Sequence, residues 1–191
     1  MNAKMKVGIA IPCHERDIRF LKKCLNSIQN LDLQAHYVTL NINRGERTLK
    51  QIRTDMFNHV FKSGCDVALQ CSSDFYLFPQ ILRYVDTVKV TTFPFLARRP
   101  SDFFTVLLTL LGRGWTGCYS VPRDIWFSQL RDNWDGNDSS ILNLVGRKNV
   151  VSIKRPCYYA MRPWQPSAVS KTLSHKSLLK RVWWMATRLK A

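Results

Sequence analysis

Residues 66–79 read DVALQCSSDFYLFP, and this stretch carries the strongest indication of the fold. Its first part, residues 66–71, is a short apolar run, which is typical of a buried β-strand. Asp74 comes just past the end of this strand, and a bulky apolar run ending at Pro79 follows. A lone aspartate after a strand is usually a turn or cap residue. It is also a position from which a carboxylate can hold a divalent metal that bridges two phosphates.

The elements before this strand alternate between strand and helix. Residues 6–11 form an apolar run closed by Pro12, which predicts a buried strand, and residues 36–42 predict a second strand. Apolar residues at helical spacing predict helices over residues 17–30 and 47–62, with Gly64 as the stop signal of the second. This order predicts an α/β domain with a mostly parallel central sheet flanked by helices, whose ligands bind at the carboxyl ends of the strands.

The second half of the chain has a less regular pattern. It predicts helices over residues 79–85, 101–111, 124–130 and 138–145, and strands over residues 88–93, 117–121 and 149–153. The Pro-rich stretch over residues 156–166 is interpreted as a connector to a final helix. We therefore expect a single domain over residues 1–156, followed by the connector and a C-terminal helix over residues 157–191.

Polar residues follow the first two predicted strands. Glu15, in the loop that begins at Pro12 and Cys13, could accept hydrogen bonds from a base or a ribose, although an ordinary surface turn explains this loop equally well. Asn43, after the second strand, offers a donor and an acceptor for a base edge, although Asn-x-Gly sequences are also ordinary turn chemistry.

Taken together, these features resemble family-2 glycosyltransferases, which have the GT-A (Rossmann-like) fold. The resemblance rests on the loop from Pro12 to Glu15, and on Gly64 and Asp66, which take the places of the family's Gly-Asp pair with Cys65 between them. It rests also on an Asp-x-Asp motif before a proline, with Ser72 at the first aspartate and Asp74 at the second. It implies that the donor, a nucleotide-diphosphate sugar, is bound by eight residues, namely Pro12, Cys13, Glu15, Asn43, Arg53, Ser72, Ser73 and Asp74. It also implies that Asp74 is a ligand of a divalent metal, Mn²⁺ or Mg²⁺.

The resemblance continues in the second half. Residues 114–119, GWTGCY, resemble the family's acceptor-site strand, and residues 134–138, WDGND, resemble the loop that opens a helix and ends in the catalytic aspartate. Asp138 is then implied to be the general base that takes the proton from the acceptor hydroxyl in an inverting transfer. Asp138 could instead be a simple helix cap, and Asp135 is the substitute for the base.

The chain of 191 residues has a formal net charge of +16, which indicates an anionic partner such as a nucleotide phosphate, a nucleic acid or an acidic membrane surface. Residues 139–191 contain eleven basic residues and no acidic one. Over residues 174–191 the apolar and basic residues fall on opposite helical faces, with Trp183 and Trp184 near the boundary. This pattern favours a basic amphipathic helix lying on an anionic membrane, although the same stripe could pack on the protein's own domain.

The six cysteines have no zinc-binding spacing and are interpreted as buried thiols in a reducing compartment, and no apolar run is long enough to span a membrane. We therefore expect a cytoplasmic protein that acts at the inner face of a membrane. Three functions remain open: a glycosyltransferase with a lipid-linked or protein-linked acceptor, a basic nucleic-acid-binding protein without catalysis, and a degenerate homologue that binds the nucleotide sugar without turning it over. The first accounts for the carboxylates at the strand ends, which nucleic-acid binding does not explain.

Overall fold

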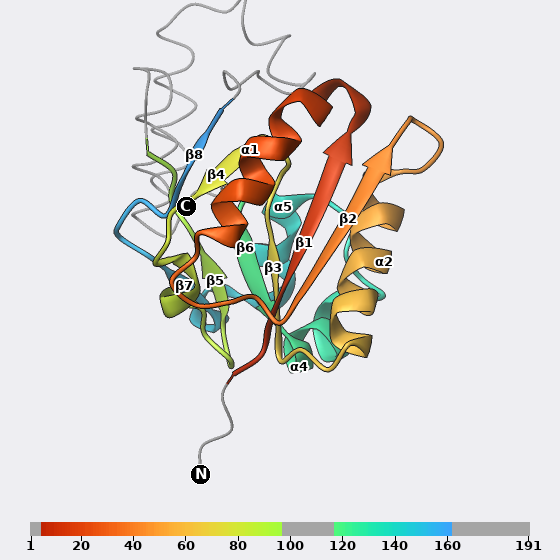
Figure 1. Cartoon of the computed structure of the whole chain (residues 1–191). Helices are drawn as coiled ribbons and strands as arrows, with labels where there is room; N and C mark the ends of the chain where they lie inside the picture. Colours follow the sequence, from red (N-terminus) through yellow and green to blue (C-terminus); the bar gives the residue numbers. More distant parts are fainter. Residues whose placement is uncertain (1–4, 97–116, 162–191) are drawn as a thin grey trace, which may run out of the picture. The chain divides into compact units, whose positions relative to one another are not determined.

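The structure is a computed structural model that describes residues 5–96 and 117–161, drawn in colour in Figure 1. The helix predicted over residues 101–111 and the predicted C-terminal helix lie outside the described residues. Within the described ranges, no helix has the length and apolar character needed to cross a membrane.

The centre of the domain is a six-stranded sheet in the order β2-β1-β3-β6-β5-β7. Its strands are β1 (Val7–His14), β2 (Tyr37–Asn43), β3 (Val67–Gln70), β5 (Val90–Thr92), β6 (Tyr119–Pro122) and β7 (Val150–Ser152). β1 is parallel to β2 and β3, and β5 is parallel to β7, whereas β6 is antiparallel to both of its neighbours. The predicted mostly parallel α/β sheet is confirmed, and the reversal of β6 is a feature that the sequence did not indicate.

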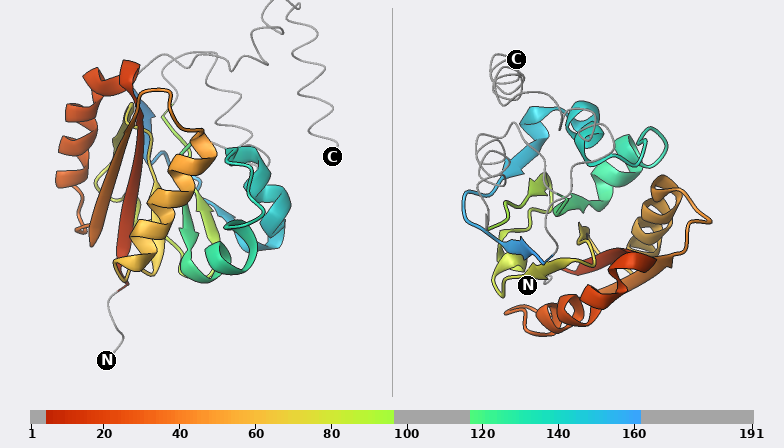
Figure 2. Two further views of the ribbon diagram at one scale, coloured as in Figure 1. Left: turned by 90° about the vertical axis from the view of Figure 1, so that its right-hand side faces the viewer. Right: turned by 90° about the horizontal axis from the view of Figure 1, so that it is seen from above.

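Helices cover both faces of this sheet. α1 (Ile18–Gln29) lies on one face and α2 (Leu49–Lys62) on the other, as the left view of Figure 2 shows. Alternate residues of β1 supply the two layers: Ile9 and Ile11 pack in the core beneath α1, and Ala10 packs in the core beneath α2. The short helices α4 (Arg123–Ile125) and η3 (Trp126–Leu130) and the helix α5 (Asp138–Val145) add their apolar side chains to the α2 layer.

The first strand is longer than predicted, because it continues through Pro12 to His14. The carbonyl of Ala10 accepts a hydrogen bond from Cys71 N at 3.0 Å, so the backbone groups of Ala10 face β3. Because backbone groups alternate along a strand, those of Pro12 also point toward the β3 side of β1. At this height β3 has already ended, since its last residue is Gln70. The missing N–H of Pro12 therefore costs no ladder bond, and the prediction that this proline ends the strand is wrong.

A second, two-stranded sheet was not predicted. β4 (Phe75–Leu77) pairs antiparallel with β8 (Tyr158–Ala160), and the rings of Tyr76 and Tyr159 stack across the pair with centroids 4.9 Å apart. Residues 157–161 were interpreted from the sequence as part of a connector, but they pack on the domain through this small sheet. Cys157 is fully buried, and Met161 N donates to the carbonyl of Asp74 at 2.7 Å. The helix predicted over residues 79–85 is a single 3₁₀ turn, η2 (Ile81–Tyr84).

Candidate functional site

The strand-end residues singled out from the sequence share one edge of the sheet. His14 lies opposite Asn43 in the parallel register of β1 and β2, and Cys71 N donates to the carbonyl of Ala10, four residues before His14 in β1. Glu15, in the 3₁₀ turn η1 (Glu15–Asp17), and the segment from Ser72 to Asp74 therefore follow the carboxyl ends of three adjacent parallel strands. This is the edge at which open α/β sheets bind their ligands.

The segment after β3 is held closely against β1. Ser73 and Asp74 are 1% and 7% exposed, and Phe75 N closes a turn onto the carbonyl of Ser72 at 3.0 Å. Burial raises the pKa of the Cys13 thiol, and the nearby Ser73 hydroxyl opposes this shift. Ser73 is thus directed at β1, and Ser72 retains partial access to solvent.

Asn43 uses its side chain to close the loop between β2 and α2. Its amide Nδ2 donates to the carbonyl of Arg47 at 2.9 Å, and its Oδ1 accepts from Gly45 N at 3.0 Å. Gly45 has φ of +100°, a left-handed conformation that favours glycine. Both polar atoms of the Asn43 side chain therefore serve the turn, each through one bond, and the second N–H of Nδ2 and the second lone pair of Oδ1 are what the side chain could offer to a nucleotide base.

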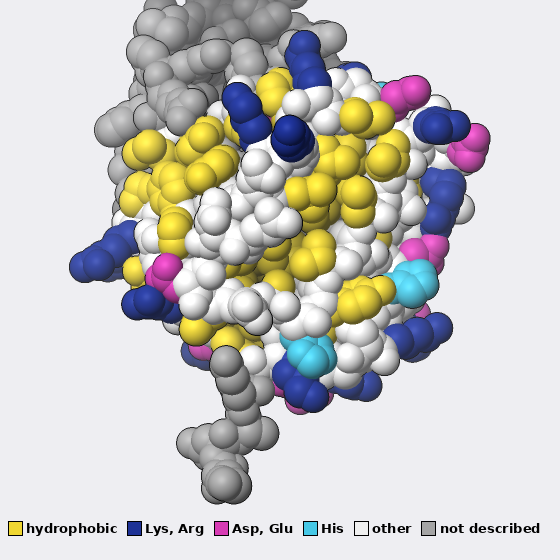
Figure 3. Space-filling view, viewed as in Figure 1, with side chains coloured by type: hydrophobic (Ala, Val, Ile, Leu, Met, Phe, Trp, Pro, Cys, Tyr) yellow, Lys and Arg dark blue, Asp and Glu magenta, His cyan; other side chains and the backbone are white. Residues whose placement is uncertain are grey.

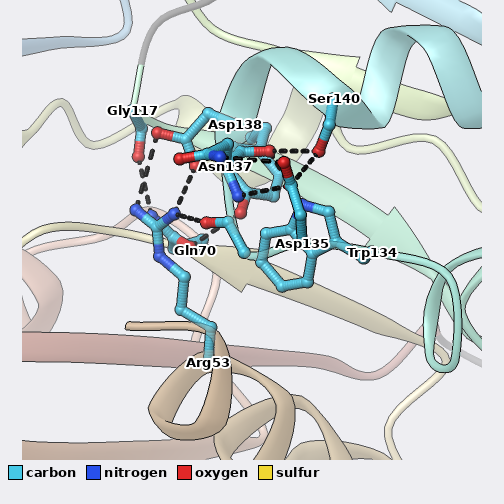
Figure 4. A network of polar contacts seen from close by, with 10 residues as sticks. Arg53, Gln70, Gly117, Trp134, Asp135, Asn137, Asp138 and Ser140 are labelled. Carbon is cyan, nitrogen blue, oxygen red and sulfur yellow. Dashed lines mark hydrogen bonds and ion pairs between the residues drawn. The ribbon is translucent and has the colours of Figure 1, made fainter. Parts of the chain in front are cut away.

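Arg53 and Asp138, 85 residues apart in the chain, meet in a second cluster (Figure 4). Arg53 projects from α2, and Asp138 is the first residue of α5. Nη1 of Arg53 lies 2.7 Å from Oδ1 of Asp138 and donates to the carbonyl of Gly136 at 2.6 Å. The guanidinium also lies 5.9 Å from the ring of Trp134, which is fully buried. These contacts fix the loop that leads into Asp138.

Two residues that sequence reasoning missed complete this cluster. The Tyr119 hydroxyl, at the start of β6, lies 2.7 Å from Oε1 of Gln70 and also hydrogen-bonds with the Asp138 carboxylate. Gln70 Nε2 donates to the carbonyl of Gly117 at 3.2 Å. A polar glutamine at the end of an otherwise apolar, fully buried strand was the available signal, because a buried amide must find partners.

The two aspartates of the loop have different chemistry. Burial raises the pKa of Asp138, and the nearby Arg53 cation and the Tyr119 hydrogen bond oppose the shift without cancelling it. Asp135 accepts hydrogen bonds from the Ser140 hydroxyl and from the Asn137 amides, and these lower its pKa to about 2. Asp138, a quarter exposed and reachable from solvent, is therefore the stronger base, whereas Asp135 organises the start of α5.

Replacing Arg53 by methionine is expected to destabilise the domain by about 2–3 kcal/mol at neutral pH, because the partly buried Asp138 loses its cation. The loss should shrink as the pH falls through the raised pKa of Asp138, since a protonated carboxyl needs no counter-charge. Chemical unfolding between about pH 5 and about pH 8 measures this change. In an Arg53→Met/Asp138→Asn variant most of the stability should return, and an equal loss at both pH values would contradict the account.

Comparison with known proteins supports the class of fold. No family model matches the chain, and no curated protein matches it in sequence. Among solved structures, the chain is similar to the mannosyltransferase PcManGT from Pyrobaculum calidifontis in complex with GDP-Man and Mn²⁺, with a TM-score of 0.58 and 11% identity over 86% of this chain and 59% of that one. It is also similar to Mycobacterium tuberculosis glucosyl-3-phosphoglycerate synthase in complex with Mn²⁺, UDP-glucose and phosphoglyceric acid, with a TM-score of 0.55 and 10% identity over 96% of this chain and 81% of that one.

A third similar structure is TarS 1–349 from S. aureus in complex with UDP-GlcNAc, with a TM-score of 0.54 and 14% identity over 85% of this chain. The chain spans about three-fifths of PcManGT and of this TarS fragment. The fold is therefore that of the GT-A glycosyltransferases. The membership in family 2 that the sequence resemblance implied stays a prediction.

Proposed function

We propose that the protein is a nucleotide-sugar-dependent glycosyltransferase with Asp138 as its general base. The observation that carries the proposal is the state of Asp138, a quarter-exposed carboxylate with a raised pKa, held by Arg53 and Tyr119 in a domain of GT-A fold. The structurally similar proteins were solved with GDP-Man, UDP-glucose and UDP-GlcNAc, which supports a donor of this chemical class.

In the proposed reaction, a carboxylate oxygen of Asp138 accepts the proton of the acceptor hydroxyl as the hydroxyl oxygen attacks the anomeric carbon. The bond from that carbon to the diphosphate breaks on the opposite face, and its electron pair leaves with the nucleoside diphosphate, so the configuration inverts. Arg53 keeps its charge throughout and holds the carboxylate in place. The raised pKa of Asp138 favours proton uptake, because a more basic carboxylate is the better acceptor.

The donor is proposed to lie along the carboxyl ends of β1, β2 and β3, against Pro12, Cys13 and Glu15 on one side and Ser72, Ser73 and Asp74 on the other. Arg53, implied by the resemblance to bind the donor, is instead assigned to positioning Asp138, since its guanidinium pairs with Asp138 and donates to the carbonyl of Gly136 in the same loop. Association with an anionic membrane through residues 174–191, and hence a lipid-linked acceptor, remains part of the proposal.

The described residues fit a divalent metal only if the diphosphate of the donor supplies most of its ligands. Within residues 5–96 and 117–161, no three His, Cys, Asp or Glu side chains converge as a ligand set, so a resident metal cage is not found there. Magnesium-type sites in nucleotide enzymes often use one or two carboxylates together with substrate phosphates, and Asp74 can supply one. Such an ion would neutralise charge on the departing diphosphate.

Thermal unfolding with ligands tests the proposal. UDP or GDP with Mn²⁺ should raise the melting temperature, corresponding to about 2.7 kcal/mol when the ligand is at 100 times its dissociation constant. Asp74→Asn should lose the part of this rise that depends on Mn²⁺ and keep the part seen with nucleotide and EDTA. Stabilisation by a single-stranded oligonucleotide, with none by any nucleoside diphosphate, would replace the proposal by nucleic-acid binding.

Transfer assays then separate an active enzyme from a degenerate homologue. A panel of radiolabelled UDP- and GDP-sugars, incubated with Mn²⁺ or Mg²⁺, should release nucleoside diphosphate from one donor, faster when an acceptor is added. Binding without release from any donor would support the non-catalytic alternative, which Ser72 in place of an aspartate motivates.

A further inference from the structure

The outer edge of β2 combines a free strand edge with an exposed apolar row. β2 is the first strand of the sheet, and in the described part of the chain it pairs only with β1. Val38, Leu40 and Ile42 point to the α1 face and are 41%, 39% and 44% exposed. Figure 3 shows hydrophobic side chains gathered over β2 and the neighbouring flank of α1. An apolar row of this kind on a sheet edge indicates an interaction surface.

The backbone of this strand presents hydrogen-bonding groups in a defined pattern. His36 N donates to the carbonyl of Val7 at 2.7 Å, so the backbone groups of the even-numbered residues face β1. Those of Tyr37, Thr39, Asn41 and Asn43 therefore face outward. No described strand meets them, and another strand is the structure that can pair all four at once.

The strand also lacks the features that usually protect a sheet edge. Its sequence, YVTLNIN, has no charged residue, no proline and no glycine. Natural edge strands are commonly guarded by lysine, proline or a bulge, which prevent pairing with other chains. In a chain with a net charge of +16, this uncharged edge is a place where a second copy can approach without like charges meeting along the strand.

We propose that β2 is a dimerisation surface, at which β2 of a second copy pairs antiparallel about a two-fold axis at Leu40. In this register Tyr37 pairs with the second copy's Asn43, and Thr39 with its Asn41, so every outward backbone group has a partner. Leu40 then lies opposite Leu40 of the second copy, and Val38 lies opposite its Ile42. The apolar rows of the two copies therefore contact each other side by side on the same face of the joined sheet. These are the non-hydrogen-bonded positions of an antiparallel pair, where side chains lie closest.

The size of the contact sets the expected strength. Seven residues extend over roughly 23 Å, and the edge of the strand, with α2 on one face and the exposed apolar row on the other, is about 15 Å deep, which gives roughly 350 Å² per copy and about 700 Å² in total. This lies below the size of standard stable interfaces, so we expect a weak, reversible dimer that forms only at high protein concentration. A lipid surface would cover the apolar row but would leave the outward backbone groups without partners, and the second copy accounts for both.

Cysteine cross-linking tests the register. In the full chain with Leu40→Cys, copper-phenanthroline should oxidise the two thiols across the axis to one disulfide, because Cα atoms of such pairs lie about 4.5 Å apart, within the range that disulfides span. All six native cysteines are buried. Val88→Cys, at a site that is 72% exposed away from this edge, is the control. Cross-linking no faster at position 40 than at position 88 would overturn the proposal.

A proline substitution tests the hydrogen bonds separately. Thr39→Pro removes an outward N–H in each copy and leaves the bonds to β1 intact, so the melting temperature should change little. Sedimentation velocity should show the dimer dissociation constant at least about tenfold higher. A dimer that tolerates Thr39→Pro uses another surface. A chain that stays monomeric at high concentration, and whose binding to phosphatidylglycerol vesicles is lost in Leu40→Lys, would identify a lipid surface as the occupant instead.

Discussion

Replacing Asp138 by asparagine is expected to lower kcat by about 10²–10⁴ while the dissociation constant of the donor changes little. The amide is nearly isosteric with the carboxylate and can still accept a hydrogen bond from Arg53, so the loop should keep its shape. It cannot take up the acceptor proton, and only that step is lost. Steady-state kinetics with the cognate donor, combined with calorimetric titration of the nucleoside diphosphate, measures both quantities.

Asp135→Asn is the matched control, because Asp135 lies in the same loop but accepts hydrogen bonds from Ser140 and Asn137 that serve the start of α5. Its effect should fall on stability, by about 1 kcal/mol, with kcat preserved. The rate of the unaltered enzyme should rise with pH through the raised pKa of Asp138, since the base acts in its deprotonated form. Unchanged turnover in Asp138→Asn would remove this residue as the base.

Replacing Gly136 by alanine is expected to be among the most destabilising single changes in the domain, by about 3–4 kcal/mol. Gly136 has φ of +89°, and a Cβ atom built there would lie 2.7 Å from Cα and 2.9 Å from N of Lys50. Because the clash is with the backbone of α2, the loop must move, and the bond from Arg53 to the Gly136 carbonyl is lost with it. Chemical denaturation, together with the pH dependence of turnover, should report both effects.

Gly146→Ala is the control that measures the cost of a positive φ without a steric clash like the one between position 136 and Lys50. Gly146 has φ of +73°, yet nothing lies within 4 Å of the position that its Cβ would occupy. With ψ of 150° the residue lies in an extended region of positive φ that is almost restricted to glycine, so this variant should cost about 1–3 kcal/mol from backbone conformation alone. Equal losses in the two variants would show that contact with α2 is unimportant for the Asp138 loop.

The order of elements could be predicted from sequence because the first three strands and two helices have strong patterns. β1 and β3 are apolar runs buried on both faces, and α2 begins at a capping box of Thr48 and Gln51. The short β4 and β8 escaped prediction because three residues are too few for periodicity, and the proline at residue 156 is a loop signal. Their pairing is decided by non-local aromatic contacts such as Phe75 with Tyr158.

The candidate site was only partly predictable for a related reason. Asp138 could be picked out as a candidate because it ends a recognisable motif. Its ion pair with Arg53 joins residues that are 85 positions apart in the sequence, and no local pattern indicates such a contact. Tyr119 ends the stretch that resembles the acceptor-site strand, but nothing in the sequence singles out its hydroxyl, which gains a role only because β6 runs beside β3 in the antiparallel sense.

The place of β6 in the sheet also bears on how the chain folds during synthesis. β5 precedes β6 along the chain, yet among the described strands it pairs only with β6 and β7. A nascent chain that ends before residue 119 therefore carries β5 without either of the two neighbours that it has among the described strands, and these strands cannot form one sheet until β6 inserts between β3 and β5. Domains that depend on such late, long-range strand pairing fold slowly. During synthesis, the sheet formed by the described strands β2, β1 and β3 therefore has two unpaired edges, those of β2 and β3, until β6 has been made.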